Sequence, residues 1–297
     1  MNNMTALVSA FARAYHTEKY IVPIFSDPIA GMLLGEDYQQ IAQTMAQGIR
    51  FFAPDFQGSE EEALRLIVDQ QLSPAPLGRS AFAERSLKTA VALGMEQYLL
   101  FGAGYDTFAL RQPEWAQKLQ IFELDLPESV ADKQQRIQKA GLSIPENTFY
   151  LPVDLSQEEW QKILLEHKSF SPEKRSFCSL LGLVYYLPQE AFENLLDRLQ
   201  DLLPEGSALV LDYPMKQGKG QQSEKQKALA QGAGEPMKAV YEQEEMEQLL
   251  SCRRFGLYEH LTPKEMTEQY FALHNKANPQ HPMEAMEAVG YCLAVKK

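Results

Sequence analysis

Three apolar runs in the sequence each end in residues that could contact a nucleotide. The first run, residues 97–101, leads into Gly102-Ala103-Gly104. The second, residues 121–125, ends in acidic residues at roughly the 20-residue spacing of nucleotide-binding folds, and a third, residues 149–154, also closes on an acid. Glycines let the backbone approach a ligand, and a carboxylate at the next strand end can accept hydrogen bonds from ribose hydroxyls. The series therefore predicts one cofactor crevice at the carboxyl edge of a parallel sheet.

The glycine loop favours S-adenosylmethionine over a dinucleotide. A dinucleotide fingerprint has a third glycine three residues after the second, so that the pyrophosphate can sit on a helix N-terminus. That position is Thr107 here, and it follows Asp106. A carboxylate beside the loop repels a pyrophosphate but suits the sulfonium and ammonium groups of S-adenosylmethionine. An NAD-dependent oxidoreductase is therefore the less favoured alternative.

The elements that must position these residues change character along the chain. Residues 1–93 show apolar residues at helical spacing, which predicts a helical N-terminal region or cap. Residues 94–297 alternate between strand and helix patterns, which predicts an α/β domain with a doubly wound, Rossmann-like sheet. Strands are expected near 97–101, 120–124, 148–152, 176–181, 207–212, 256–261 and 290–295, with helices at 127–140 and 189–203.

The segment 214–250 is expected to be a lid inserted between the fifth and sixth strands. Its polar, glycine-rich start, which includes Gly218-Lys219-Gly220, is expected to be a mobile hinge, and residues 236–250 are expected to form a helix. Together with the helical N-terminal region, this segment could cover the strand ends and exclude water.

Composition limits the function classes. The 297 residues are 45% hydrophobic and carry a formal net charge of −12, which argues against nucleic acid and against nonspecific attraction to anionic membranes. The three cysteines are far apart, so neither a disulfide framework nor a metal site is expected. The N-terminus lacks a basic signal-peptide region, and no apolar run reaches the roughly 18 residues of a membrane span. A cytoplasmic location is expected.

Several motifs resemble those of the leucine carboxyl methyltransferase family, which includes bacterial O-methyltransferases associated with polyketide biosynthesis. The similarity is collinear from about residue 10 to residue 213. It implies a class I methyltransferase fold of seven strands, the last antiparallel, and S-adenosylmethionine as cofactor. The matching segments are Arg13-Ala14 (RA), residues 27–30 (DPyA), residues 102–107 with Arg111 (GAGLDTR…R), residues 122–127 with Lys133 (yEvDlP…K), residues 153–155 with Trp160 (vDL…W) and residues 186–188 (YLp).

The methionine part of the cofactor is expected beside Gly102-Ala103-Gly104 and Asp106. Arg79 matches a family arginine upstream of this loop, and its guanidinium could hold the methionine carboxylate in bidentate fashion. Arg13 is a second candidate for that role. The alternatives are a plain strand-to-helix turn for the glycines and a solvated helix charge for Arg79.

Acidic residues are expected to bind the ribose and the adenine. Glu123 and Asp125 are two apart on one strand and so share a face, and the family pattern favours Asp125 as the ribose ligand. Asp154 is expected to accept from the adenine amino group, with the backbone of Leu155 beside it. The alternatives are surface exposure for the first pair and an N-cap of a helix at 156–166 for Asp154.

The sequence departs from the family pattern at two positions, and it is silent on the acceptor. Leu181 stands where the family commonly has a glutamate, which could weaken the affinity or mark an inactive cofactor-binding protein, and Phe108 stands in place of an arginine. Tyr185 and Tyr186 could place a phenol near the transferred methyl group, although both could equally be core residues.

Methyl transfer needs mainly positioning, and a base only for a hydroxyl acceptor. We expect O-methylation of a small-molecule hydroxyl or carboxyl, with a protein C-terminal carboxylate as the alternative.

Overall fold

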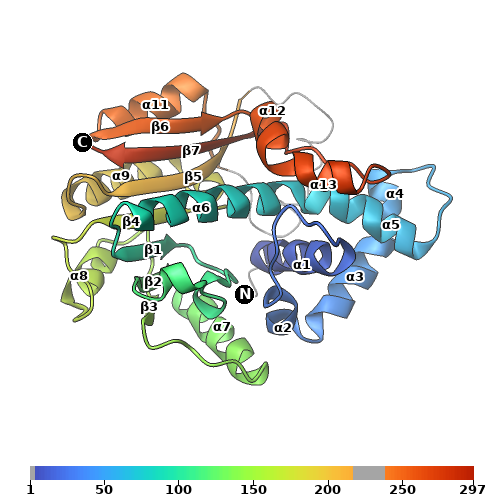
Figure 1. Ribbon diagram of the computed structural model, residues 1–297, viewed down its shortest axis with the longest axis horizontal. Coiled ribbons are helices and arrows are strands. Elements are labelled where there is room, and N and C mark those ends of the chain that lie inside the picture. Colours follow the sequence, from blue (N-terminus) through green and yellow to red (C-terminus); the bar gives the residue numbers. More distant parts are fainter. Residues whose placement is uncertain (1–3, 217–237) are drawn as a thin grey trace.

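The computed structural model describes residues 4–216 and 238–297, and its centre is a seven-stranded sheet with the strand order β3-β2-β1-β4-β5-β7-β6 (Figure 1). β7 pairs antiparallel with both of its neighbours, and the other pairs are parallel. The doubly wound sheet predicted from the sequence is thereby confirmed. The strands are β1 (Gln97–Phe101), β2 (Gln120–Asp125), β3 (Thr148–Pro152), β4 (Ser176–Leu180), β5 (Ala208–Pro214), β6 (Phe255–Leu261) and β7 (Val289–Lys296).

The central strands are short apolar runs because helices cover both faces of the sheet. Every residue of β1, β4 and β5 is buried, as expected for parallel strands between two helical layers. One face packs against α6 (Pro74–Ala92), which Figure 1 shows running across the sheet. The opposite face packs against α8 (Glu159–Glu166), α9 (Gln189–Leu202) and α11 (Gln243–Ser251). The fully buried Trp160 of α8 anchors this second core.

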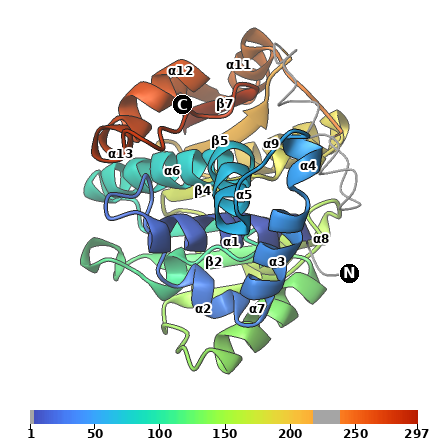
Figure 2. The ribbon, with the colours of Figure 1, turned by 90° about the vertical axis from the view of Figure 1, so that its right-hand side faces the viewer.

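The N-terminal helices form a third core, beyond the carboxyl ends of the strands (Figure 2). This core includes Tyr105, which directly follows the glycine loop, so the helical region packs against the loop itself. The helices are α1 (Met4–Lys19), α2 (Ala30–Leu34), α3 (Asp37–Gln47), α4 (Ile49–Phe52) and α5 (Glu60–Ile67), followed by the π-helical turn η1 (Val68–Leu72).

The remaining helical elements connect the strands. α7 (Pro127–Lys139) follows β2 and packs against β3. Between β6 and β7 the chain forms α12 (Pro263–Met266), the π-helical turn η5 (Thr267–Phe271) and α13 (Ala272–Ala277), none of which was predicted. Short 3-10 turns follow β1 and β4, namely η2 (Phe108–Leu110), η3 (Glu114–Ala116) and η4 (Val184–Tyr186). No helix within the described residues is both long and apolar enough to cross a membrane.

The expected helix at 236–250 is wrong in its first part. Residues 238–242 are not helical, and α11 begins at Gln243. Glu242 is its N-cap, and its backbone N–H donates to the Glu245 side chain over 2.9 Å, so a capping box ends the extended segment. The predicted hinge at Gly218-Lys219-Gly220 lies outside the described residues.

Candidate functional site

A cavity of about 450 Å³ lies at the carboxyl ends of β1 to β4, between the sheet edge and α1. Both α1 and α6 contribute side chains to it. Glu123 and Tyr185 do not line the cavity, although both were candidates from the sequence. The predicted residues that do line it are Arg13, Arg79, Gly102, Ala103, Gly104, Asp106, Asp125, Asp154, Leu155 and Tyr186.

The glycine loop adopts a conformation that requires glycine. Gly102 and Gly104 have φ of 66° and 49°, in the left-handed region that side chains disfavour. A Cβ at Gly104 would also lie 3.2 Å from the Cβ of Ala6 on α1. The loop therefore passes tightly between the end of β1 and α1.

Asp125 ties the end of β2 to the glycine loop. Its Oδ2 accepts from the backbone N–H of Gly104 over 2.6 Å, and its Oδ1 accepts from that of Leu126 over 2.7 Å. A carboxylate has about four acceptor positions, so this one can still accept from a diol. The carboxylate is positioned by the same loop that would bind the cofactor, which supports its predicted role as the ribose ligand.

Glu123 is the clearest departure from the predicted site. Its side chain is buried and pairs with Lys133 of α7, with 2.5 Å between Nζ and Oε2. Burial raises the pKa of Glu123, although Lys133 opposes that effect. The two-residue spacing does place Glu123 and Asp125 on one face, but α7 covers that face at Glu123, and only the strand end faces the cavity.

Asp154 lies exposed at the rim of the cavity. Its Oδ1 accepts from the backbone N–H of Ser156 over 2.9 Å and from the Ser156 hydroxyl over 2.7 Å. The adjoining helix α8 begins at Glu159, so Asp154 stabilises a local turn instead of capping a helix at 156. Leu155 lines the cavity beside it. Their contact with adenine stays a prediction.

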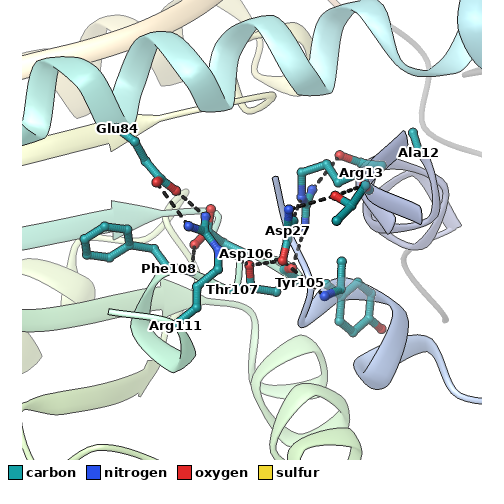
Figure 3. A network of polar contacts seen from close by, with 12 residues as sticks. Ala12, Arg13, Asp27, Glu84, Tyr105, Asp106, Thr107, Phe108 and Arg111 are labelled. Carbon is teal, nitrogen blue, oxygen red and sulfur yellow. Dashed lines mark hydrogen bonds and ion pairs between the residues drawn. The ribbon is translucent and has the colours of Figure 1, made fainter. Parts of the chain in front are cut away.

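A buried ion network joins α1 to the glycine loop (Figure 3). Arg13 Nε donates to Asp27 Oδ2 over 2.8 Å, and Arg13 Nη2 donates to the Tyr105 carbonyl over 2.7 Å. The Thr107 hydroxyl donates to Asp27 Oδ1 over 2.7 Å, and Arg111 lies 3.6 Å from that oxygen. Burial alone would raise the pKa of Asp27, but Arg13 and Arg111 together hold it below its usual value. Asp27 is thus an ionised carboxylate that connects Arg13 of α1 with Thr107 and Arg111 behind the cavity wall.

Arg79 reaches the cavity from α6. Its Nη2 donates to Ser9 Oγ over 3.1 Å, and its Nη1 lies 3.5 Å from Asp212 Oδ2. Gly182, with φ of 64°, makes room for the guanidinium, because a Cβ there would lie 2.5 Å from Nη1. Arg79 is therefore a partly buried, paired cation and not a solvated helix charge.

Asp212 was not singled out from the sequence. It is fully buried near the end of β5, and its Oδ1 accepts from the Gly182 backbone N–H over 2.6 Å. Its Oδ2 accepts from the Tyr185 hydroxyl over 3.0 Å. The signal was present, because residues 208–212 form another apolar run that ends in an acid, like those of β2 and β3.

The two tyrosines after β4 have different positions. Tyr185 is buried, and burial followed by the nearby charge of Asp212 raises the pKa of its phenol well above the usual value. Tyr186 lines the cavity. Only Tyr186 could therefore contact a ligand, and Tyr185 supports Asp212 from behind.

The two family departures also have distinct surroundings. Leu181 lines the cavity, so the end of β4 presents an apolar side chain there. Phe108 is buried against Tyr98, with 5.3 Å between the ring centroids, and belongs to the core. Asp106, which also lines the cavity, uses Oδ1 to accept from the Phe108 backbone N–H over 2.8 Å. Together with Asp125 and Asp154, it gives the described cavity wall carboxylates that could face a cationic ligand.

The polar groups that line the cavity fit those of S-adenosylmethionine. Arginine N–H groups at one end suit the methionine carboxylate, and Asp106 suits the ammonium and sulfonium charges. Asp125 and Asp154 provide acceptors for the ribose and the adenine amino group. The left-handed glycine loop leaves the backbone open to close approach.

Comparisons with known proteins show the family and the fold of this chain. A sequence model described as "Leucine carboxyl methyltransferase" matches residues 6–200. A Bacillus subtilis protein named "Putative S-adenosyl-L-methionine-dependent methyltransferase YktD" is 36% identical, and the alignment covers 100% of this chain and 98% of that protein. A Mycobacterium tuberculosis protein named as a methyltransferase with the same cofactor is 30% identical, with 71% of this chain and 64% of that protein covered. A DUF574 family crystal structure from Streptomyces avermitilis shares the fold, with a TM-score of 0.60 at 15% identity over 85% of this chain and 97% of that one.

Proposed function

This chain belongs to the leucine carboxyl methyltransferase family and is an S-adenosylmethionine-dependent methyltransferase, and from that premise we propose that it methylates an oxygen atom of a small molecule. The observation that carries the proposal is the cavity itself. Its volume of about 450 Å³ lies within the range of small-molecule pockets, roughly 300–1,000 Å³. Beyond the residues assigned to the cofactor, its wall contains Leu183, Tyr186 and Leu187. This apolar and phenolic surface suits a partly apolar acceptor.

The chain's own residues would contribute binding and orientation more than acid–base chemistry. When bound, S-adenosylmethionine supplies a methyl carbon that its sulfonium has already activated. Asp106 would hold the cationic part of the cofactor, and Asp125 would orient the ribose. Tyr185 is not a base at neutral pH, because its raised pKa keeps the phenol protonated and its hydroxyl donates to Asp212. A carboxyl acceptor needs no base, so this arrangement suffices for ester formation.

A carboxylate acceptor is favoured by one further observation. Lys238 lines the cavity from its exposed rim, and its backbone N–H donates to the Tyr185 carbonyl over 2.8 Å. Within the described part of the chain, no hydrogen bond or ion pair of the Lys238 ammonium is found. A cation in this position would attract an anionic acceptor toward the cavity mouth.

The cofactor preference is tested by thermal unfolding and calorimetry. S-adenosylhomocysteine should bind and raise the melting temperature, because a ligand that binds only the folded state stabilises it, whereas NAD should do neither. Saturating S-adenosylhomocysteine with no thermal shift and no heat of binding would contradict a functional cofactor site in this chain.

The acceptor class needs its own measurement. The protein would be incubated with methyl-labelled S-adenosylmethionine and either a panel of small phenols and carboxylic acids or folded proteins with a free C-terminus. We expect label transfer to a small molecule, in a form that alkaline hydrolysis releases if the product is an ester. Methylation of a folded protein's C-terminal carboxylate would overturn the proposed acceptor class.

A further inference from the structure

Two buried histidines hold the segment of residues 20–27, which follows α1. The backbone N–H of Ile24 donates to His16 Nε2 of α1 over 2.9 Å. His274 Nδ1 of α13 lies 2.9 Å from the Val22 carbonyl oxygen. Both histidines are fully buried, and their rings lie 4.8 Å apart between centroids. The segment is therefore attached at two nearby positions, one to α1 and one to α13.

These contacts assign the tautomer of each ring. His16 Nε2 accepts a hydrogen bond, so the neutral ring carries its proton on Nδ1. A carbonyl oxygen only accepts, so His274 Nδ1 carries a proton. The amide of Asn278 fits this assignment, because its Nδ2 lies 3.3 Å from His274 Nδ1 but donates to the His274 carbonyl over 3.0 Å. Within the described part of the chain, His16 Nδ1 and His274 Nε2 have no hydrogen-bond partner that would stabilise a positive charge.

A proton on His16 would break one of the two attachments. The only lone pair of the neutral ring is at Nε2, so a proton added there would meet the Ile24 N–H, donor against donor. The charged ring would also be buried beside a second histidine. Burial, and secondarily His274, lowers the pKa of His16 to about 3 in the folded protein. The contact with Ile24 thus persists only while His16 is neutral.

Other titratable groups surround the pair, but they hold the segment differently. The Tyr20 ring packs on both histidines, and its hydroxyl donates to Asp69 Oδ2 of η1 over 2.5 Å. Burial raises the pKa of Asp69, although nearby cationic groups oppose that effect. Among the described contacts of this cluster, only His16 uses a titrating nitrogen to accept from the backbone of residues 20–27. The remaining groups are Tyr15 and Lys19 of α1, Glu61 and Arg65 of α5, and His281 after α13.

The segment connects this contact to the cavity wall. Asp27 lies three residues after Ile24. Its carboxylate accepts from Arg13 Nε over 2.8 Å and from the Thr107 hydroxyl over 2.7 Å. Arg13 Nη2 also donates to the carbonyl of Tyr105, at the end of the glycine loop, over 2.7 Å. A displacement of Ile24 would therefore act on Asp27 and, through it, on the loop.

We propose that the His16–His274 pair is an acid-sensitive latch on residues 20–27, which opens when a proton on His16 releases Ile24 and which in its open form binds the cofactor weakly. Neither histidine lines the cavity, so the effect acts through the segment and needs no contact with the ligand. Binding and opening are reciprocally linked, so a bound cofactor in turn keeps the latch closed. The inference requires the cofactor site of the family and is independent of the proposed acceptor.

Amide hydrogen exchange measures the latch directly. The protection factor of the Ile24 amide, corrected for the intrinsic rate at each pH, should fall about thirtyfold between pH 7.5 and pH 5, because His16 in the open form binds protons with its ordinary pKa of 6.5. Amides of the buried strand β1 report global unfolding and should keep a higher protection at both pH values. This comparison uses the unaltered protein, so it decides the question even if a histidine variant fails to fold.

Matched variants separate His16 from its neighbours. His16→Gln keeps an oxygen that can accept from Ile24 but binds no proton in this pH range, so the protection of the Ile24 amide should become independent of pH. The control is His281→Gln, which removes a histidine of the same cluster. The His281 side chain lies 3.2 Å from Arg65 and has no described contact with residues 20–27, so this variant should behave like the unaltered protein.

A ligand arm tests the coupling to the cofactor site. Saturating S-adenosylhomocysteine at pH 5 should raise the protection of the Ile24 amide about tenfold or more, the scale of a typical coupling between two sites, whereas NAD should leave it unchanged. Unchanged protection in the S-adenosylhomocysteine complex would refute the coupling.

The latch itself is overturned by any of four results in the exchange experiment. These are a protection of Ile24 that does not depend on pH, an equal fall in His16→Gln, loss of the fall in His281→Gln, or exchange of Ile24 and β1 only through a common unfolding. If S-adenosylhomocysteine does not bind the unaltered protein, the cofactor assignment fails instead, and exchange in the free protein still tests the latch.

Discussion

At the scale of single residues, Glu123 and Asp125 show how position along one strand decides a carboxylate's role. Glu123 lies under α7, where Lys133 neutralises it, and Asp125 lies at the end of β2, where backbone N–H groups hold it. The first is a structural ion pair, and a buried charge left without its partner is strongly destabilising. The second keeps free acceptor positions facing a cavity.

We expect Asp125→Ala to weaken the binding of S-adenosylhomocysteine by about 1–3 kcal/mol, because charge-assisted hydrogen bonds of that size would be lost. Glu123→Gln should lower the free energy of unfolding by disturbing the pair with Lys133, with little effect on the affinity of the folded protein. Calorimetry and urea unfolding of both variants separate these effects. A larger loss of affinity in the Glu123 variant would contradict the assignment of the ribose ligand.

The sequence predicted the acidic residues at the cavity, but it did not predict which residues pair with Arg79. Asp125 and Asp154 were found because each ends a recognisable apolar run. The contacts of Arg79 with Ser9 and Asp212 join residues 70 and 133 positions apart, which no local pattern encodes. Glu123 was placed on the correct face, but the position of α7 over it is a tertiary feature.

At the scale of elements, the turn after β4 holds Arg79 in place. Gly182 has φ of 64° and lies directly under the guanidinium, whereas Gly141, at the end of α7, has φ of 67° with no atom within 4 Å of a Cβ built there. The two glycines therefore share a backbone conformation and differ in what an added methyl group would meet.

Replacing either glycine by alanine should lower stability by about 1 kcal/mol through left-handed backbone strain. Only Gly182→Ala should also displace Arg79, and we expect it to weaken S-adenosylhomocysteine binding about tenfold or more. Thermal unfolding and calorimetry of the pair would measure both effects. Equal affinities for the two variants would show that the position of Arg79 does not govern binding.

The strands were predicted to within a few residues because a fully buried parallel strand is a short apolar run between polar turns. The start of α11 was predicted too early because the polar residues before it contain no proline or glycine next to Gln243. The capping box between Glu242 and Glu245, which marks the true start, is recognised only from the geometry of the structure. The helices between β6 and β7 were missed because α12 and α13 are only four and six residues long. Short helices carry too little periodic signal.

At the scale of the whole molecule, the first helix meets the last one through a buried histidine pair. The rings of His16 and His274 lie 4.8 Å apart between centroids, with Tyr20 beside both. His16 Nε2 accepts from the Ile24 backbone N–H over 2.9 Å, and His274 Nδ1 lies 2.9 Å from the Val22 carbonyl. Neither histidine lines the cavity, so the pair has a structural position away from the site.

Buried His16 should make the free energy of unfolding depend on pH. Burial, and secondarily His274, lowers the pKa of His16 to about 3 from its ordinary 6.5. Between these values the unfolded chain binds a proton that the folded chain does not. Stability should therefore be fully present above about pH 6.5 and fall as the pH decreases, by up to about 1.4 kcal/mol per pH unit from this group.

Urea unfolding at pH 7.5 and pH 5 would test this for the unaltered protein and for His16→Gln, whose amide oxygen can still accept from Ile24. The loss of stability on acidification should be smaller in the variant, while the contribution of nearby Asp69 is present in both proteins. An identical loss in the two proteins would contradict the assignment.

Helix α1 both covers the cavity and contacts the glycine loop and Arg79, which matters for the design of chimeric proteins. The helix covers the cavity. Its Ser9 accepts hydrogen bonds from Arg13 and Arg79, and its Ala6 packs against Gly104. A recombinant that exchanges the N-terminal helices between relatives, in order to change the acceptor, would exchange these contacts with Arg79 and the glycine loop too. Crossover points should therefore fall after Asp27, so that Arg13 and its counter-ion are inherited together, and Thr107 and Arg111 should be matched to the incoming helix.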